Sequence, residues 1–312
     1  MFEPGTLVVV AVSGGPDSIC LLHAMARLRR LFAIDLACFH FDHGLRPESE
    51  RDAVYVRRQA SSLQVPCHLR RADSKPDRGE SVEAWARGVR YRALNDVLEE
   101  LGGGVAAVGH TADDQAETLL LAVLRGGGLE ALAGMRPVNR PIVRPLLEVP
   151  RKETVAFCRA LRLRPRRDPM NEDPRFLRAA IRTRVIPELE RRVDRGVGGA
   201  LSRTASLLRR DADFLDRLAR EAEREVVQTQ AAGSVLVRAT LLSELPWPIA
   251  SRVIRRLLRD LGSSVEAAHV EATLDLAAGP SGRSVSLPGG LRAVREGGYL
   301  RVFRPSPGTH RL

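Results

Sequence analysis

The sequence has few lysines, few cysteines and no long apolar run, and each absence narrows the class of protein. Lys75 and Lys152 are the only lysines among 49 Lys and Arg residues. The four cysteines show no CxxC or other metal-ligand spacing, which argues against a zinc site. The apolar run at residues 7–12 is too short for a signal peptide or a membrane span. We therefore expect a cytoplasmic protein whose cysteines are mostly buried and reduced.

The overall composition indicates a folded protein with a polyanionic partner. The chain has 312 residues, of which 44% are apolar, so it can form one large or two ordinary domains. Its net charge is +11 and its pI is about 10.6. That charge favours nucleic acid, an anionic membrane surface or a phosphorylated ligand. Coding bias is the alternative, but it explains Arg in place of Lys better than it explains excess positive charge.

The first half of the chain alternates strand and helix patterns. The expected strands are residues 7–12, 35–40, 65–69 and 105–108. The expected helices are residues 18–31, 50–63, 81–101 and 114–124, with Ser81 as the N-cap of the third. Continuous apolar strands that alternate with helices are typical of a parallel sheet covered on both faces. The sequence thus predicts an α/β fold with a Rossmann-like, doubly wound parallel sheet.

The second half changes character after Pro150. Residues 151–195 carry 14 Arg or Lys against 7 Asp or Glu, and their prolines predict only short helical pieces. Residues 197–228 have the pattern of a long connecting helix. The C-terminal part predicts helices at 248–261 and 266–277, with strands at 235–238, 284–287, 291–295 and 299–303. We expect a catalytic domain at 1–190, a helical linker at 191–230 and a small α/β domain at 231–312.

The first candidate site is a Gly-rich loop between the first strand and the first helix. Glycines allow sharp backbone turns with N–H groups directed at an anion, and the helix start adds its dipole. Asp17 would repel a phosphate, but it suits a loop that also holds Mg²⁺. The loop matches neither GxxxxGK[ST] nor GxGxxG, and an ordinary glycine turn is the alternative. It consists of Ser13, Gly14, Gly15, Pro16, Asp17 and Ser18.

Two further polar motifs follow later strands, where open α/β sheets bind ligands. After the second strand come His40, Asp42, His43 and Arg46, for which acid–base, metal, phosphate and purely structural roles all stay open. After the fourth strand come His110, Asp113, Asp114 and Glu117. Helix capping explains one or two of these acids. His110, Asp114 and Glu117 would share one face if the helix begins early enough. All three motifs should converge on one crevice.

Taken in order, the motifs resemble those of the tRNA(Ile)-lysidine synthetases, which belong to the PP-loop ATP pyrophosphatases. The resemblance rests on SGGPDS, FDHGLRPES, GHTADDQAETLL, LRGGGLEALAGM and RPLL-x-VPR. It is close over residues 5–190, whereas the C-terminal part is similar only in length and coarse pattern. SGG-x-DS alone marks the wider superfamily, and the block around residues 109–135 is the more specific signal.

The resemblance implies a two-step reaction on isoleucine tRNA. ATP would adenylate C2 of the wobble cytidine in the CAU anticodon, and L-lysine would then expel AMP. Asp17, Asp114 and Arg90 would be catalytic, with Asp17 and Asp114 as Mg²⁺ ligands. A homodimer is compatible with the resemblance, and no membrane partner is implied. The ATP-binding residues would be Ser13, Gly14, Gly15, Pro16, Asp17, Ser18, His40, Asp42 and His110.

The basic residues of the family pattern are expected to contact tRNA or lysine. Arg87, Arg90 and Tyr91 match the family's A-x-x-R-x-x-RY pattern. One departure is Ala179-Ala180, where relatives carry two polar residues, which puts detailed RNA contacts in doubt. A solvated basic face is the alternative interpretation of residues 151–195. The expected tRNA- or lysine-binding residues are Arg46, Arg87, Glu117, Arg175, Arg178 and Arg182.

Three other functions stay open on the sequence alone. A PP-loop tRNA thiolase needs reactive cysteines or an iron–sulfur site, and the cysteine spacing does not indicate one. An amidotransferase such as an NAD synthetase would not need the basic segment. An RNA-binding module with a vestigial nucleotide site would not need both SGGPDS and Asp114. We expect the C-terminal domain to help by contacting the acceptor stem.

Overall fold

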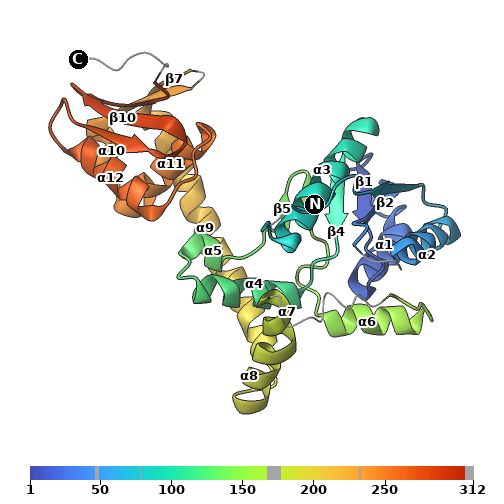
Figure 1. Ribbon diagram of the computed structural model, residues 1–312. Helices are drawn as coiled ribbons and strands as arrows, with labels where there is room; N and C mark the ends of the chain where they lie inside the picture. Colours follow the sequence, from blue (N-terminus) through green and yellow to red (C-terminus); the bar gives the residue numbers. More distant parts are fainter. Residues whose placement is uncertain (46–48, 78, 167–176, 232, 306–312) are drawn as a thin grey trace. The chain divides into compact units, whose positions relative to one another are not determined.

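The computed structural model describes residues 1–45, 49–77, 79–166, 177–231 and 233–305 (Figure 1). The chain forms two compact units, Met1–Arg209 and Arg210–Leu312. The boundary lies inside the long helix α9 (Val197–Val226), close to the helix expected at 197–228. The proposed domain limits at residues 190 and 230 therefore stay a prediction. No helix among the described residues is long and apolar enough to cross a membrane.

The N-terminal unit is built on a six-stranded sheet with the order β3-β2-β1-β4-β6-β5. The pairs from β3 to β6 are parallel, as the apolar strand patterns predict, while β5 runs antiparallel to β6. Sequence analysis missed β5 and β6, because two residues are too few to show a period. The strands are β1 (Leu7–Ala11), β2 (Asp35–Asp42), β3 (Cys67–Arg71), β4 (Val105–Val108), β5 (Val138–Asn139) and β6 (Ile142–Val143).

Helices cover both faces of this sheet, so the doubly wound fold is confirmed. One apolar core lies between the sheet and a layer that includes α1 and α2, and a second lies under α3. Ser81 caps α3 as expected, since its Oγ accepts a hydrogen bond from Ala84 N. Each helix follows a strand, and the first three lead directly to the next strand. The helices are α1 (Pro16–Leu28), α2 (Ser49–Ser62), α3 (Val82–Glu100) and α4 (Ala112–Leu124).

The basic segment contains more helix than its prolines predict. The expectation of short pieces is wrong for a ten-residue helix that begins immediately after Pro150. Proline at that point costs little, because the first helical N–H groups have no partner within the helix. This helix is α6 (Arg151–Ala160). The other helices outside the layers on the sheet are short: α5 (Leu129–Leu132), α7 (Leu177–Ala180), the π-helical turn η2 (Ile181–Val185) and α8 (Ile186–Arg192).

The C-terminal unit is a five-stranded antiparallel sheet with helices on one face (Figure 1). The expected small α/β domain is thereby confirmed. The first strand was missed because the charged helical pattern continues to residue 228. The strands, in the order β7-β8-β11-β10-β9, are β7 (Val227–Ala231), β8 (Ser234–Arg238), β11 (Tyr299–Phe303), β10 (Leu291–Glu296) and β9 (Ser284–Leu287). The helices are α10 (Ala239–Glu244), α11 (Trp247–Asp260) and α12 (Ala267–Ala278), followed by the short turn η3 (Pro288–Gly290).

The topology predicts a ligand crevice between the carboxyl ends of β1 and β4. From β1 the chain builds the sheet outward on one side with β2 and β3. It then returns to place β4 on the other side of β1, so the direction of the strand order reverses between β1 and β4. Ligands of open α/β sheets bind at the carboxyl ends of the strands at such a point. The Gly-rich loop follows β1 there, and Gly109 follows β4. A Cβ on Gly109 would lie 3.1 Å from Asp17 C and from Ser18 N, so glycine lets the two loops approach.

We expect Gly109→Ala to lower the free energy of unfolding by about 1–3 kcal/mol, because an added methyl group must push the two loops apart. Gly128→Ala is the matched control, since Gly128 has a φ of −75° and no heavy atom within 4 Å of an added Cβ. Urea unfolding followed by tryptophan fluorescence measures both variants. Equal stability of the two would show that close approach at Gly109 is not required.

Candidate active site at the sheet switch point

The Gly-rich loop closes on itself through Ser18. Gly14 has a φ of +96°, a conformation that glycine adopts without strain. Gly14 N donates to Ser18 Oγ at 3.2 Å, and Ser18 Oγ donates to Gly15 O at 2.9 Å. Pro16 occupies the first turn of α1, where its missing N–H is tolerated. The six loop residues thus lie together at the N-terminus of a 13-residue helix, as the sequence predicts.

Asp17 is held by two residues of α6. Arg151 Nε donates to Asp17 Oδ2 at 2.9 Å, and Thr154 Oγ1 donates to Asp17 Oδ1 at 2.5 Å. Burial raises the pKa of Asp17, and the opposing attraction of Arg151 offsets this only in part. The side chain is largely buried, so an unpaired charge there would be costly. Helix α6 therefore fixes the acid that the loop brings to the crevice.

Asp114 both caps helix α4 and faces the crevice. Its Oδ2 accepts hydrogen bonds from Thr111 N and Thr111 Oγ1, each at 2.8 Å. Arg151 Nη2 lies 3.3 Å from the same oxygen. Burial acts to raise the pKa of Asp114, but Arg151 and Arg178 outweigh it, so the pKa is lowered overall. Asp114 therefore carries its charge at neutral pH.

Glu117 is the most buried acid of the site, with 1% of its side chain exposed. Arg178 Nε donates to Glu117 Oε2 at 2.8 Å, and Arg182 Nε donates to Oε1 at 2.5 Å. Arg182 Nη2 also reaches Asp114 Oδ1 at 3.2 Å. The acid–arginine cluster is thus three carboxylates matched by three guanidinium groups. Its members are Asp17, Asp114, Glu117, Arg151, Arg178 and Arg182.

Sequence reasoning found the acids of this cluster but missed two of their partners. Arg151 and Thr154 received no role, although Arg151 belongs to the RPLL-x-VPR motif. That motif was the available signal. Helix α4 begins at Ala112, so His110 precedes it instead of lying on its face as expected. Asp114 and Glu117 do act on one side of the helix, because Arg178 and Arg182 contact both.

A second set of basic residues lies beside His110. Arg87 and Arg90 stack on Tyr91, with guanidinium carbons 4.9 and 5.6 Å from the ring centre. Arg144 is 7% exposed and was not singled out from the sequence. Burial lowers the pKa of Arg90 and of Arg144. Arg87 is exposed and Arg90 is half-buried, and none of these three arginines forms a salt bridge with a described carboxylate, so together they favour an anion as ligand. We call Arg87, Arg90 and Arg144 the basic group.

His110 is held neutral between the two sets of charges. Burial lowers its pKa to about 4, and Arg144 adds to the effect while Asp114 opposes it. Arg144 Nε donates to His110 Nδ1 at 3.2 Å. Since Nδ1 accepts, the proton of the neutral ring must lie on Nε2. His110 can therefore donate a hydrogen bond from Nε2, but it is not charged at neutral pH.

The motif after β2 lies next to the loop without joining the cluster by any contact among the described residues. His40 is buried and bonds Val12 O through Nδ1 at 2.7 Å, and burial lowers its pKa. Its Nε2 has no hydrogen-bond partner in the described part of the chain. Asp42 accepts from Gly44 N at 2.8 Å and lies 3.6 Å from Arg71 Nε. Convergence of the three motifs therefore stays a prediction.

Two expected binding residues, Arg46 and Arg175, lie outside the described residues.

Comparison with known proteins shows which family uses this arrangement. Residues 3–189 match the PP-loop domain, and residues 238–301 match the TilS substrate binding domain. A tRNA(Ile)-lysidine synthase of Salinispora arenicola is 39% identical over 96% of this chain and 91% of its own length. The chain belongs to the tRNA(Ile)-lysidine synthase family. The family and the carbon–nitrogen ligase class expected from the motifs are thus confirmed, and the similarity extends beyond residue 190.

Other members of the family are longer. The tRNA(Ile)-lysidine synthase of Symbiobacterium thermophilum is 38% identical over 98% of this chain and 67% of its own length. That of Clostridium perfringens is 31% identical over 97% of this chain and 66% of its own length. The chain thus spans about two thirds of these two synthases.

A solved structure supports the fold alone. The U34-tRNA thiolase NcsA from Methanococcus maripaludis, determined with its [4Fe-4S] cluster, has a TM-score of 0.56. It is 17% identical and covers 66% of this chain and 74% of its own. The match confirms the sheet architecture of the PP-loop enzymes. It carries no argument for sulfur transfer.

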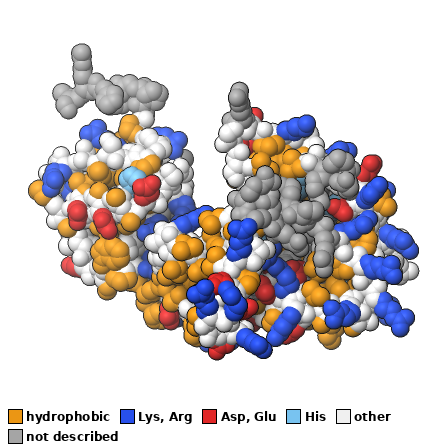
Figure 2. Space-filling model, turned by 60° about the horizontal axis from the view of Figure 1, so that its bottom comes forward, with side chains coloured by type: hydrophobic (Ala, Val, Ile, Leu, Met, Phe, Trp, Pro, Cys, Tyr) orange, Lys and Arg blue, Asp and Glu red, His pale blue; other side chains and the backbone are white. Residues whose placement is uncertain are grey.

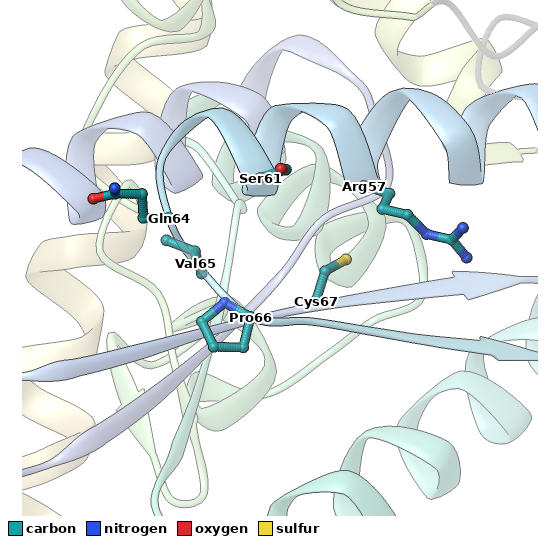
Figure 3. Close-up of a pocket in the computed structure, with 6 residues that line it drawn as sticks. All are labelled: Arg57, Ser61, Gln64, Val65, Pro66 and Cys67. Carbon is teal, nitrogen blue, oxygen red and sulfur yellow. The ribbon is translucent and has the colours of Figure 1, made fainter.

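The cysteines of this family member do not supply a thiolate at the switch point. Burial raises the pKa of Cys20 to about 12 and that of Cys158 to about 11, so both stay protonated at neutral pH. Cys38 and Cys67 are register partners on β2 and β3, and a hydrogen bond between them lowers the pKa of Cys67. A cavity of about 450 Å³ adjoins Cys67 at the amino end of β3 (Figure 3). That end of the sheet is opposite the carboxyl ends that carry the acid–arginine cluster.

The neutral state of His110 makes stability depend on pH. In the folded state the pKa of His110 is about 4, whereas in the unfolded state the ring takes up a proton near the ordinary histidine pKa of 6.5. The contribution of neutral His110 to the free energy of unfolding is therefore fully present above pH 6.5 and is lost as the pH falls toward 4. The loss amounts to about 3 kcal/mol for this residue. The free energy of unfolding, measured with urea at several pH values between 4 and 6.5, should fall less steeply with pH in His110→Gln than in the wild type. Equal slopes of unfolding free energy against pH in the two proteins would refute the assignment.

Proposed function

We propose that this chain forms lysidine in two steps. It adenylates C2 of the wobble cytidine of an isoleucine tRNA with a CAU anticodon, and L-lysine then displaces AMP. One observation carries the proposal: Arg151 joins Asp17 of the Gly-rich loop to Asp114 at the start of α4. The loop suits the phosphates of ATP, and the acids after β4 suit a cationic amine. The crevice thus brings an anion site and a cation site together.

ATP would bind at the Gly-rich loop. The N-terminus of α1 favours negative charge, and Ser13 and Ser18 offer hydroxyl groups beside it. Nε2 of His40 is an acceptor without a partner in the described part of the chain, and an exocyclic amine is a ligand of the right chemistry. Cleavage between the α and β phosphates adds negative charge. The basic group and Nε2–H of His110 are suited to stabilise it.

Mg²⁺ would be held by Asp17 and Asp114. Their carboxylate oxygens are the ligand type that Mg²⁺ prefers, so the residues fit the ion by chemistry. The described residues include no group of three or more His, Cys, Asp or Glu side chains arranged for a metal. Phosphate oxygens and water would therefore complete the coordination, as is usual at nucleotide sites. Both acids now contact Arg151, whose guanidinium would have to move aside.

The substrate lysine would be bound by Asp114 and Glu117. The lowered pKa of Asp114 makes it a weak base, so it suits binding of an ammonium group better than proton transfer. Arg178 and Arg182 contact the acids that a substrate cation would use. If tRNA phosphates bound Arg178 and Arg182, these arginines would leave Asp114 and Glu117, and the two carboxylates would be free to bind the amine of lysine. Arg178 and Arg182 would thus link tRNA binding to lysine binding.

The tRNA would bind across the basic surface of the N-terminal unit. Lys and Arg side chains are spread over the face of this unit that Figure 2 shows. Contacts between arginine and phosphate give affinity and salt dependence but no base choice. The target cytidine must leave its stack to reach the crevice. Its C2 oxygen becomes a leaving group only after adenylation, so ATP cleavage has to precede attack by the amine.

Nucleoside mass spectrometry tests the proposed reaction. The protein is incubated with ATP, L-lysine and a transcript of the isoleucine tRNA, and lysidine and AMP are measured. We expect Asp17→Asn and Asp114→Asn each to slow lysidine formation by at least ~100-fold, the usual scale for loss of an electrostatic catalyst. Asp35→Asn is the matched control, because Asp35 is an exposed acid at the amino end of β2. The control should keep the wild-type rate.

Two results would contradict the proposal. Wild-type protein that releases no AMP in the presence of the tRNA would remove the lysidine reaction altogether. Full activity of Asp17→Asn would remove the proposed metal and phosphate role of the loop acid.

A further inference from the structure

Two of the four cysteines stand side by side on neighbouring strands. Cys38 on β2 and Cys67 on β3 are register partners of a parallel pair. Both side chains belong to the core under the layer that includes α1 and α2, so they lie on the same face of the sheet. Neighbouring strands are about 4.8 Å apart, which is within the Cα separation of about 4.4–6.8 Å found in disulfides. The backbone therefore allows the two sulfur atoms to form a bond with each other.

The two thiols differ in exposure, and a hydrogen bond joins them. Cys38 is completely buried, whereas Cys67 is partly exposed at the first residue of β3, the outermost parallel strand of the sheet. The hydrogen bond lowers the pKa of Cys67 and raises the pKa of Cys38, so the thiol of Cys38 donates to the sulfur of Cys67. The thiolate is the reactive form of cysteine. Cys67 is thus the nucleophile of the pair, and Cys38 keeps its proton.

A cavity gives small molecules access to Cys67. Its volume is about 450 Å³, and residues of α2 and of the loop that leads into β3 line it (Figure 3). Arg57 of α2 is exposed and lines the same cavity. Besides the hydrogen bond from Cys38, the positive charge of Arg57 also lowers the pKa of Cys67. In Figure 3 the sulfur of Cys67 is directed toward the α2 side of the cavity. A small polar oxidant can therefore reach the sulfur from this side.

The other two cysteines lack this combination of features. Cys20 and Cys158 are 5% and 2% exposed, and burial raises the pKa of each. Both stay protonated at neutral pH, and a buried thiol of this kind is chemically inert. Oxidation of the folded chain is therefore expected at Cys67 first.

We propose that Cys67 is a site of reversible oxidation by a hydroperoxide, and that Cys38 resolves the product as a disulfide between β2 and β3. The proposal does not rest on the proposed function. In the first step the sulfur of Cys67 attacks an oxygen of the peroxide. A sulfur–oxygen bond forms, the oxygen–oxygen bond breaks, and water or an alcohol leaves. Cys67 is thereby oxidised by two electrons to a sulfenic acid, and the peroxide is reduced.

Cys38 acts as the resolving thiol in the second step. Its sulfur attacks the sulfur of Cys67, so a sulfur–sulfur bond forms while the sulfur–oxygen bond breaks. The proton of Cys38 goes to the departing hydroxide, which leaves as water. Because the two residues are already adjacent, this step is intramolecular and should outrun further oxidation of Cys67 to the sulfinic acid. A dithiol reductant restores both thiols by exchange.

The position of the pair separates this chemistry from the candidate active site. Cys67 begins β3, so it lies at the amino ends of the parallel strands, whereas the Gly-rich loop and the acid–arginine cluster lie at the carboxyl ends. A bridge between Cys38 and Cys67 would tie β3 to its neighbour without entering the crevice. The site is therefore a modification site of the scaffold and has no part in the transfer reaction.

Peptide mass spectrometry of the full chain after treatment with hydrogen peroxide tests the proposal. We expect a peptide cross-linked through Cys38 and Cys67 to form at least about tenfold faster than any modification of Cys20 or Cys158. Dithiothreitol should remove the cross-link. In Cys38→Ala the reaction should stop at the sulfenic acid of Cys67, which dimedone traps. Cys20→Ala is the matched control, since Cys20 is a buried cysteine of the same core, and it should form the cross-link at the wild-type rate.

A second pair of variants tests whether the cavity is the reactive surface. Arg57→Gln should slow oxidation of Cys67 by about three- to tenfold, because a nearby cation favours the thiolate. Arg58→Gln removes the same charge from the next residue of α2, which is exposed but lies outside the described lining of the cavity. This control should keep the wild-type rate within about twofold, since exposed charges at a distance are largely screened. Equal rates in the two variants would overturn the assignment of this cavity.

Two results would overturn the proposal as a whole. Equal oxidation rates at all four cysteines of the folded wild type would show that Cys67 has no special reactivity. A sulfenic acid that persists in the wild type as long as it does in Cys38→Ala would show that Cys38 does not resolve it. Thermal melting checks the folding of each variant. The comparison of the four cysteines uses the wild type alone, so the proposal stays falsifiable even if one variant fails to fold.

Discussion

The ion pairs of Arg151 connect the parts of the site that the fold brings together. The sheet places two loops at its switch point, and each loop delivers a buried or largely buried carboxylate. Such carboxylates would repel each other and stay protonated without a cation between them. Arg151 bonds Asp17 and Asp114 at once, and Arg178 and Arg182 complete the balance at Glu117. Close approach at Gly109, the capping of α4 and the docking of α6 all serve this arrangement.

The sheet was predictable because its strands are apolar on both faces. Residues 105–108 were expected as a strand and form β4 without any shift, and the first and second strands differ by one or two residues. The third strand is shifted from 65–69 to Cys67–Arg71, since polar residues at a sheet edge blur the pattern. Strand β7 was hidden, because a charged helix and an exposed edge strand have the same composition.

The acids of the site were predictable, whereas most of their partners were not. Asp17 and Asp114 lie in the first turns of helices that follow buried strands, and Glu117 lies one turn further along the same helix as Asp114. Arg144 and Arg151 are the first and last residues of the RPLL-x-VPR motif, which marks them among many arginines but does not show which acids they contact. Long side chains reach across several residues, so their contacts depend on tertiary packing. His110 is a further case, because only the contact with Arg144 reveals its tautomer.

The charge balance of the cluster also links folding to chain order. The three acids lie within residues 17–117, but the arginines that neutralise them come from residues 151–182. During synthesis the sheet strands up to β4 emerge before any of these arginines. Until α6 to η2 dock, the three carboxylates are a set of like charges without their counter-ions, which disfavours taking them out of water. Closure of the sheet around its three acids therefore has to wait for the segments that carry Arg151, Arg178 and Arg182, which are made later.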